Sequence, residues 1–447
     1  MTISSTNPST KHRFRAPWII FWVGLALRIA CILIGHTYRV RLNDNHFDFG
    51  FEAGRIAQSL VEGRGYANPF NGISGPTAWL PPLYPLLMAV AFKLFGVYSR
   101  GAAFFLLACN SVFSAAIAPA IYEIAARCFD AQGIARRGSK HDAPVALWSA
   151  WLWAAYPAAL QYAIHWIWEM SLSTCLLTWT LVVALRLRRV GEEEPLADAR
   201  RDLRLWLSFG LLWGLVMLSN ASVMLVLPGT IVWILWPRQG LRRGIAGAAL
   251  ACVVMGIVMA PWVIRNERTM HAFIPTRDNL GVELWQSSLF YHEAFPWGTA
   301  MPLWPGDPEF RKYVRMGEFA YAQQKGTEAK RNLRARPDLF LKYTLMRLQF
   351  FWFGTPHPTE GRPLNEFFRI LNYSFLSVAG LLGMGLALKR RVPAACLMAS
   401  VFLLVPVAYY VVTVQARFRH PIEPLIAILS VYLFRSTTLR RATLGSL

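Results

Sequence analysis

The sequence predicts an all-α fold, a polytopic helical membrane protein with about ten transmembrane helices. Hydrophobic residues make up 55% of the 447 residues, with 18 Trp and 28 Phe among them. They occur in blocks of about 15 to 22, and about 20 apolar residues span the hydrocarbon core of a bilayer. Arg-rich or Pro/Gly-rich joints separate the blocks, whereas a soluble chain of this size would show shorter amphipathic periods.

The apolar blocks give the expected membrane spans, and the joints between them give the orientation. Basic runs follow every second block, and the net charge of +21 comes largely from block ends, so topology explains it better than a nucleic-acid partner does. The positive-inside rule places these joints and both termini in the cytoplasm, which predicts a multi-pass protein of the inner (cytoplasmic) membrane. The expected spans are 17–35, 102–126, 143–163, 169–187, 205–220, 222–236, 245–263, 366–388, 393–414 and 421–435.

This topology divides the chain into three parts. An N-terminal transmembrane module, 1–263, contains the first outer loop, 36–101. A mostly helical outer-face segment, 264–365, follows, and C-terminal transmembrane helices occupy 366–447. Within the first outer loop, helical spacing over 51–61 predicts an interfacial helix lying against the membrane. Residues 81–96 are too short to span comfortably and are expected to be re-entrant or interfacial.

Several function classes find no support in the sequence. The six cysteines are scattered without a CxxC pair, so neither a disulfide framework nor a zinc site is indicated. No Gly-rich phosphate loop, HExxH or GxSxG motif occurs, which argues against soluble nucleotide hydrolysis and metalloprotease chemistry.

The first outer loop begins with an acidic group, Asp44, Asp48 and Glu52, just after the first span. Carboxylates at the boundary between water and lipid can act as a general base, or can hold a metal ion or a substrate hydroxyl. Taken alone, a loop acid is more often only solvated. Other outer-face joints therefore decide how the acidic group is interpreted.

Those joints carry further polar residues beside strongly apolar spans. A guanidinium group suits a phosphate or diphosphate, although a single arginine at a helix end is more often a snorkelling anchor. A histidine at the interface is equally well explained as a hydrogen-bonding residue. Convergence on one membrane face predicts a shared site that contains His165, Glu169, Arg265, Arg277, Glu283, Arg417 and Arg419.

At these residues the chain resembles bacterial membrane glycosyltransferases of the GT-C class, and is most similar to the family of protein O-mannosyltransferases and lipid A aminoarabinose transferases. The resemblance extends over nearly the whole chain. Besides the acidic loop, it is carried by IAQSLVEGRGY at 56–66, GPTAWLPPLYPLLMAVAFKLFG at 75–96, WIWEMSLS at 166–173, GLLWGLVMLSNASVMLVLP at 210–228, PWVIRNERTMHAFIPTRDNLGVELW at 261–285 and RFRHPIEPL at 417–425.

The resemblance implies a polyprenyl-phosphate-linked sugar donor and a glycan, lipid or protein acceptor on the outer face of the membrane. It also implies inversion at the anomeric carbon, with an acid of the first outer loop as catalytic base. Asp48 fills that place, but it lies one residue farther from Ile56 than is usual, so Glu52 and Asp44 stay open as base. Glu169 resembles the second acidic position of the family.

The arginines at these joints are expected to neutralise the phosphate charge that develops during transfer. The scheme requires no metal, although His165 and Glu169, four residues apart, offer two ligands for a divalent metal if they are helical. Two other classes of function remain: a transporter or flippase of lipid-linked sugars, and a non-catalytic subunit of an envelope polysaccharide system. Because the sequence has no internal repeat and its ionisable residues gather at one face, the enzyme is favoured over the transporter.

Overall fold

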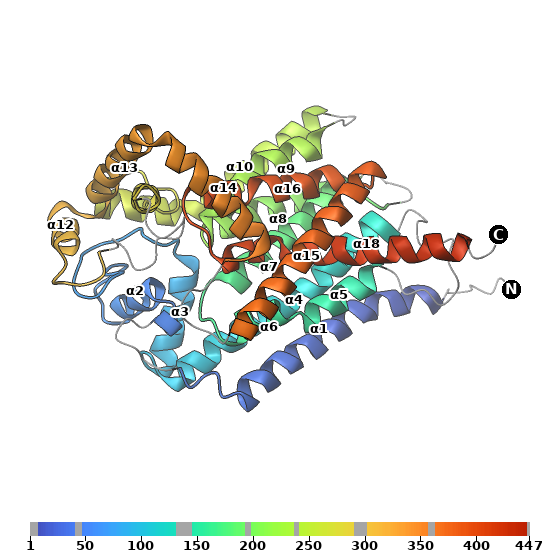
Figure 1. Cartoon of the computed structure of the whole chain (residues 1–447), viewed down its shortest axis with the longest axis horizontal. Coiled ribbons are helices and arrows are strands. Elements are labelled where there is room, and N and C mark those ends of the chain that lie inside the picture. The colour runs from blue at the N-terminus through green and yellow to red at the C-terminus, as the bar shows by residue number, and fades with distance from the viewer. Residues whose placement is uncertain are drawn as a thin grey trace.

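A computed structural model describes residues 8–40, 47–130, 145–192, 198–236, 241–289, 302–355 and 363–444. Over these residues the chain is helical, and its only β pairing is an isolated bridge between Ala67 and Pro76. The long helices run side by side along the longest axis of the molecule (Figure 1). Both termini lie at one end of this bundle, and α2, α3, α12 and α13 lie at the other. The predicted all-α polytopic fold is confirmed.

In the described part of the chain, five helices are long and apolar enough to cross a membrane. Shorter apolar helices fill other expected spans, namely α5 (Val145–Ala155), η3 with α9 (Ala221–Leu225 and Val226–Leu235), and α16 with α17 (Ala395–Leu404 and Val407–Val411). The five long helices are α1 (Pro8–Ile34), α4 (Arg100–Ala125), α7 (Met170–Leu187), α10 (Leu241–Met270) and α15 (Pro363–Lys389).

Two expected spans are broken where the sequence places a proline. The span at 143–163 divides into α5 and α6 (Pro157–Ile164), and the span at 393–414 divides at Pro406. Proline lacks the N–H that a helix interior needs but suits the first helical turn, and Pro157 begins α6 for this reason. The expected span at 205–220 is longer than predicted, since α8 (Ala199–Met217) begins where the Asp198 side chain accepts the N–H groups of Arg200 and Arg201.

Small residues set the closest helix contacts in the bundle. A Cβ atom added to Gly210 of α8 would lie 2.4 Å from the carbonyl oxygen of Ala251 in α10. A Cβ atom on Gly383 of α15 would lie 2.2 Å from the carbonyl oxygen of Leu429 in α18 (Glu423–Leu444). In lipid, where apolar side chains gain little by leaving their solvent, such close backbone approach is a main source of helix association.

The end of the bundle opposite the termini carries the first outer loop and the segment after α10. The loop contains η1 (Phe47–Phe49), α2 (Glu52–Val61) and α3 (Leu83–Phe95). Most residues of α2 are buried within the protein, Glu52 and Arg55 among them. The remaining elements are η2 (Ala126–Asp130), α11 (Leu280–Ser287), α12 (Pro308–Met316), α13 (Glu318–Ala335), α14 (Pro337–Phe353) and η4 (Ala416–Ile422).

Candidate functional site

The backbone reverses between the two described acids of the first outer loop. Gly50 and Phe51 both have positive φ angles, 75° and 46°, and they separate Asp48 in η1 from Glu52 at the start of α2. An aromatic residue with positive φ is a strained conformation, which persists only where surrounding contacts fix it. Gly50 is required for a second reason, because a Cβ atom there would lie 2.6 Å from the carbonyl oxygen of Ile167.

Ile167 belongs to the break between α6 and α7, and side chains from two other helices hold this break. The Asn110 amide of α4 donates to the carbonyl oxygens of Trp166, at 2.9 Å, and Trp168, at 3.4 Å. It also donates to the Tyr84 hydroxyl of α3, at 3.0 Å. The break therefore has a fixed shape, and it places Glu169 at the first turn of α7, beside the first outer loop.

Five charged side chains converge from four separate parts of the chain. Arg417 in η4 is close enough to interact electrostatically with three glutamates, and its guanidinium carbon lies 4.2 Å from the centre of the Trp168 ring. Arg277 forms an ion pair with one of these glutamates, Glu283, with 3.3 Å between nitrogen and oxygen. We call this group the outer charge cluster; its members are Glu52, Glu169, Arg277, Glu283 and Arg417.

Burial raises the pKa of every carboxyl group in the outer charge cluster. The pKa of Glu52, which is 6% exposed, rises to about 7, because loss of water around the carboxylate outweighs attraction to Arg417 and Arg55. The pKa values of Glu169 and Glu283 are raised for the same reason. Perturbed carboxyls that face arginines in a partly open site are typical of functional sites.

Asp48 lies in η1, four residues before Glu52 of this cluster. Partial burial raises its pKa, and none of the cluster arginines makes a marked contribution to that shift. Its neighbour Phe47 packs against Trp168, with 5.6 Å between the ring centres. The Arg417 guanidinium also lies over the Trp168 ring. Phe47, the neighbour of Asp48, and Arg417 therefore contact the same indole ring from different elements.

A groove leads from the bundle to Arg417. Its cavity has a volume of about 530 Å³ and lies between α6, α15 and η4. Aromatic side chains form much of its wall, and polar side chains from α6, α15 and the start of η4 complete it. The aromatic lining residues are Tyr156, Tyr162, Trp166, Phe368 and Tyr373, and the polar ones include Gln161, Arg369, Asn372, Gln415 and Arg417.

Arg265 contacts the first outer loop and does not lie in the outer charge cluster. Its guanidinium donates to the carbonyl oxygens of Thr77, at 2.6 Å, and Tyr66, and it lies over the rings of Tyr66 and Trp262. These contacts use the guanidinium to hold a loop. Arg265 therefore has structural partners in the first outer loop, and its expected role at the donor phosphate stays a prediction.

A buried carboxylate holds the same stretch of loop from the other side. Glu318, at the start of α13, accepts hydrogen bonds from the hydroxyls of Thr77 and Tyr313 and from the N–H of Ala78. Asp278 lies beside it, and burial together with their mutual repulsion raises the pKa of Asp278. Sequence reasoning missed this pair, because nothing in the local pattern distinguishes Glu318 from the other acids of a charged amphipathic helix.

Arg419 also has structural partners. It is fully buried and bonds to Glu423 at 3.1 Å, to the Tyr373 carbonyl oxygen at 3.0 Å and to the Ser377 hydroxyl. His420 shares Glu423, at 2.7 Å. Of Arg417 and Arg419, both expected to neutralise phosphate charge, only Arg417 is in a partly open position.

The last two sequence-predicted residues are placed as follows. His165 is exposed at the end of α6, and residues 165–169 are not helical, so the premise of an i, i+4 ligand pair with Glu169 is wrong. Across the described residues, no three His, Cys, Asp or Glu side chains gather closely enough to hold a metal ion. Asp44 lies outside the described residues.

Comparison with known proteins shows the fold. No family model and no curated protein matches the chain. The archaeal oligosaccharyltransferase AglB from Archaeoglobus fulgidus, in complex with an inhibitory peptide and a dolichol-phosphate, aligns with a TM-score of 0.56 and 14% identity over 98% of this chain. The apo form of the Archaeoglobus fulgidus oligosaccharyltransferase aligns with a TM-score of 0.55 and 17% identity over 97% of this chain. The chain covers 52% of each of these longer proteins, about half their length.

ArnT from Cupriavidus metallidurans, bound to undecaprenyl phosphate, also aligns, with 18% identity, a TM-score of 0.36, and coverage of 97% of this chain and 79% of ArnT. The oligosaccharyltransferase alignments establish that this chain has a GT-C-type membrane fold, so the resemblance predicted from its sequence is confirmed at the level of the fold. It is a multi-pass helical membrane protein.

The close approach of Gly50 to Ile167 can be tested by measuring the thermal stability of glycine variants. In Gly50→Ala, the new Cβ atom meets backbone at 2.6 Å, so the loop must move, at a cost of about 1–3 kcal/mol beyond the φ penalty. Gly63→Ala is the matched control, because Gly63 has φ 77° and a Cβ atom there meets nothing within 4 Å. We expect a clearly lower apparent melting temperature in detergent for Gly50→Ala than for Gly63→Ala; equal losses would contradict the close approach.

The raised pKa of Glu52 makes stability depend on pH. A carboxyl with a folded pKa of about 7 and an ordinary value of 4.5 favours folding below pH 4.5, and this advantage is lost as pH rises through 7. Glu52→Gln removes the charge but keeps the shape. We expect the variant to match the native protein near pH 4.5 and to exceed it by up to about 3 kcal/mol at pH 8. Thermal unfolding at both pH values measures this, and identical pH profiles would contradict it.

Proposed function

We propose that the protein is a membrane glycosyltransferase that moves a sugar from a polyprenyl-phosphate-linked donor to an acceptor hydroxyl, with inversion at the anomeric carbon. The observation that carries the proposal is the outer charge cluster, of which one member, Arg417, lines an aromatic-walled groove. In this proposal the bundle end that carries the first outer loop faces the periplasm or exterior of the inner (cytoplasmic) membrane. The acceptor is a glycan, a lipid or a protein.

The groove supports the donor half of the proposal. A polyprenyl phosphate has a long apolar chain that ends in an anion, and the groove joins an aromatic wall to the Arg417 guanidinium. Arg417 is buried enough to lose much of its water, which strengthens its attraction for a phosphate. Arg277 completes a two-arginine clamp on the leaving phosphate. This clamp would stabilise the charge that develops as the bond from sugar to phosphate breaks.

The separation of Asp48 from the arginines supports its role as the base. In an inverting displacement, the acceptor oxygen attacks the anomeric carbon on the face opposite the leaving phosphate. The base must therefore lie across the sugar from the arginine clamp. Asp48 lies in η1 and has no marked electrostatic interaction with Arg417, whereas Glu52 does interact electrostatically with Arg417. In the proposed reaction Asp48 takes the acceptor proton, and Glu52 is the alternative base.

The remaining acids have positioning roles in this scheme. Glu169 and Glu283 lie close to Arg417 and Arg277, so they orient the two guanidinium groups toward the phosphate. Their partly exposed carboxylates also offer acceptors for sugar hydroxyls. His165, exposed beside the break that precedes α7, is proposed to contact the acceptor or the membrane interface. Arg265 and Arg419 are proposed to stabilise the fold around the site.

The base assignment is tested by substitution of Asp48. We expect Asp48→Asn to lower transfer by about 100-fold or more while expression and lipid binding persist, because a general base contributes about 100- to 10,000-fold. Release of undecaprenyl phosphate from a panel of glycosyl undecaprenyl phosphates, with an envelope extract as acceptor, measures transfer. Asp338→Asn, which removes an exposed carboxylate at the start of α14, is the control. Near-native turnover by Asp48→Asn would remove Asp48 from the mechanism, and loss confined to Glu52→Gln would move the base to Glu52.

The phosphate assignment is tested by binding of undecaprenyl phosphate itself. We expect Arg417→Gln to weaken binding about 10- to 100-fold, since a charge-assisted hydrogen bond contributes about 1.5–3 kcal/mol. Native mass spectrometry of the purified protein with graded undecaprenyl phosphate gives the affinity. The control is Arg268→Gln, which removes an exposed charge in the last turn of α10 and should leave binding unchanged. Equal affinities of Arg417→Gln and the native protein would exclude Arg417 as the phosphate ligand.

A further inference from the structure

A second cavity, lined by no member of the outer charge cluster, lies beside the N-terminal part of α1, which belongs to the end of the bundle that holds the two termini (Figure 1). Its volume is about 1030 Å³, and α1, α4, η2, α7, α8 and the turn after α7 line it. The positive-inside rule predicts that this end faces the cytoplasm. Nothing in the proposed transfer reaction uses this cavity.

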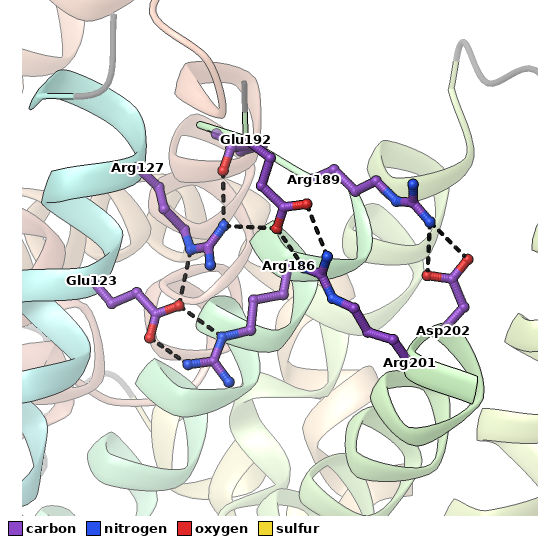
Figure 2. Close-up of polar contacts among 8 residues, drawn as sticks. Glu123, Arg127, Arg186, Arg189, Glu192, Arg201 and Asp202 are labelled. Carbon is purple, nitrogen blue, oxygen red and sulfur yellow. Dashed lines mark hydrogen bonds and ion pairs between the residues drawn. The ribbon is translucent and has the colours of Figure 1, made fainter. Parts of the chain in front are cut away.

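An alternating chain of charges forms one side of the cavity (Figure 2). Glu123 accepts hydrogen bonds from Arg127 at 2.9 Å and from Arg186 at 2.7 Å. Glu192 accepts from Arg127 at 3.3 Å and from Arg201 at 3.0 Å. Three arginines thus share two carboxylates, and one positive charge of this network is not compensated within it.

The two other carboxylates of the cavity wall face helix N-termini. Asp130 accepts the N–H groups of Val145 and Ala146 at the start of α5. Asp198 accepts the N–H groups of the first two arginines of α8. The partial positive charge of a helix N-terminus already attracts each of these acids, so they add little negative potential to the cavity.

Two further arginines supply positive charge that has no counterpart. Arg200 and Arg204 line the cavity from α8 and are exposed. Neither guanidinium has a hydrogen bond or an ion pair within the described part of the chain. Five arginines therefore face four carboxylates, and the excess charge lies on mobile, accessible side chains that can reach an anion.

Another part of the cavity wall is apolar. Trp18, which is 57% exposed, lies near the start of the membrane-spanning part of α1, and Trp179 of α7 lies on the same cavity. Pro17, Pro119 and Leu205 extend this wall. Tryptophan at this level of a transmembrane helix is typical of the boundary between head groups and hydrocarbon. A ligand that matches both walls has an anionic head and an apolar chain.

We propose that this cavity binds the phosphate head group of an anionic glycerophospholipid from the adjacent leaflet. Arg200 and Arg204 contact the phosphate, and the lipid chains lie along Trp18 and the apolar wall. The charge network of Figure 2 limits how far the head group enters the cavity. Basic pockets between transmembrane helices on the cytoplasmic side are suited to such head groups. The site is independent of the proposed sugar transfer.

The test compares lipid retention by the full-length protein and two variants. Each protein is purified in detergent, loaded with equal amounts of phosphatidylglycerol and phosphatidylcholine, and examined by native mass spectrometry. The variant R200Q/R204Q removes the two unpaired cavity arginines. The control R242Q/R243Q removes two exposed arginines at the start of α10, which do not line the cavity. Melting temperatures confirm that all three proteins are folded.

We expect the native protein and R242Q/R243Q to retain phosphatidylglycerol at least 10-fold over phosphatidylcholine, and R200Q/R204Q to lose that preference. Equal retention of the two lipids by the native protein, or an equal loss in both variants, would overturn the proposal. A third arm adds glycerol 3-phosphate as a soluble head group without chains. If it displaces phosphatidylglycerol at equimolar concentration, the site binds a soluble phosphate and the lipid assignment is wrong.

Discussion

Oppositely charged groups hold Thr77 from two sides, and the position of the first outer loop depends on this arrangement. Arg265 of α10 binds its carbonyl oxygen, while Glu318 of α13 accepts its hydroxyl and the next N–H. Each charge is costly to bury alone, but hydrogen bonds offset this cost. Arg265 donates to two backbone carbonyl oxygens of the loop, and Glu318 accepts from two hydroxyls and one backbone N–H. The loop is thereby fixed between the membrane bundle and the outer helices. Because α2 belongs to this loop, the same contacts fix the acids beside Arg417.

The two arginines of η4 differ in whether protein groups already occupy their hydrogen-bond donors. Arg419 is fully buried, and a carboxylate, a hydroxyl and a carbonyl oxygen satisfy it within the fold. Arg417, two residues earlier, stacks on Trp168 and interacts with glutamates without a hydrogen bond to any of them among the described residues. A guanidinium with unused donors at the end of a groove retains binding capacity for an anion. A guanidinium whose donors are occupied within the fold, such as that of Arg419, has less capacity left to bind an anion.

The sequence was sufficient for the membrane helices because span length and apolar content are local properties. It also located Glu52, Glu169, Arg277, Glu283 and Arg417, since each lies at a joint on the same predicted face. It could not distinguish Arg417 from Arg265 and Arg419, because the difference lies in their hydrogen-bond partners. Arg265 bonds to Thr77, nearly two hundred residues away, and Arg419 bonds to Tyr373 on a neighbouring helix. The burial of α2 was likewise unpredictable, since the cover comes from distant segments.

Aromatic side chains determine how an acid and an arginine can act on opposite sides of one sugar. Phe47 precedes Asp48 and packs on Trp168, and Trp168 lies against the Arg417 guanidinium. This contact ties the acid of η1 to the arginine of η4 through rigid rings, without a direct ion pair that would neutralise both. An ion pair between them would lower the basicity of the carboxylate and occupy the donors that the phosphate needs. In the proposed reaction, the aromatic layer therefore keeps base and clamp close enough to share a sugar and far enough apart to stay reactive.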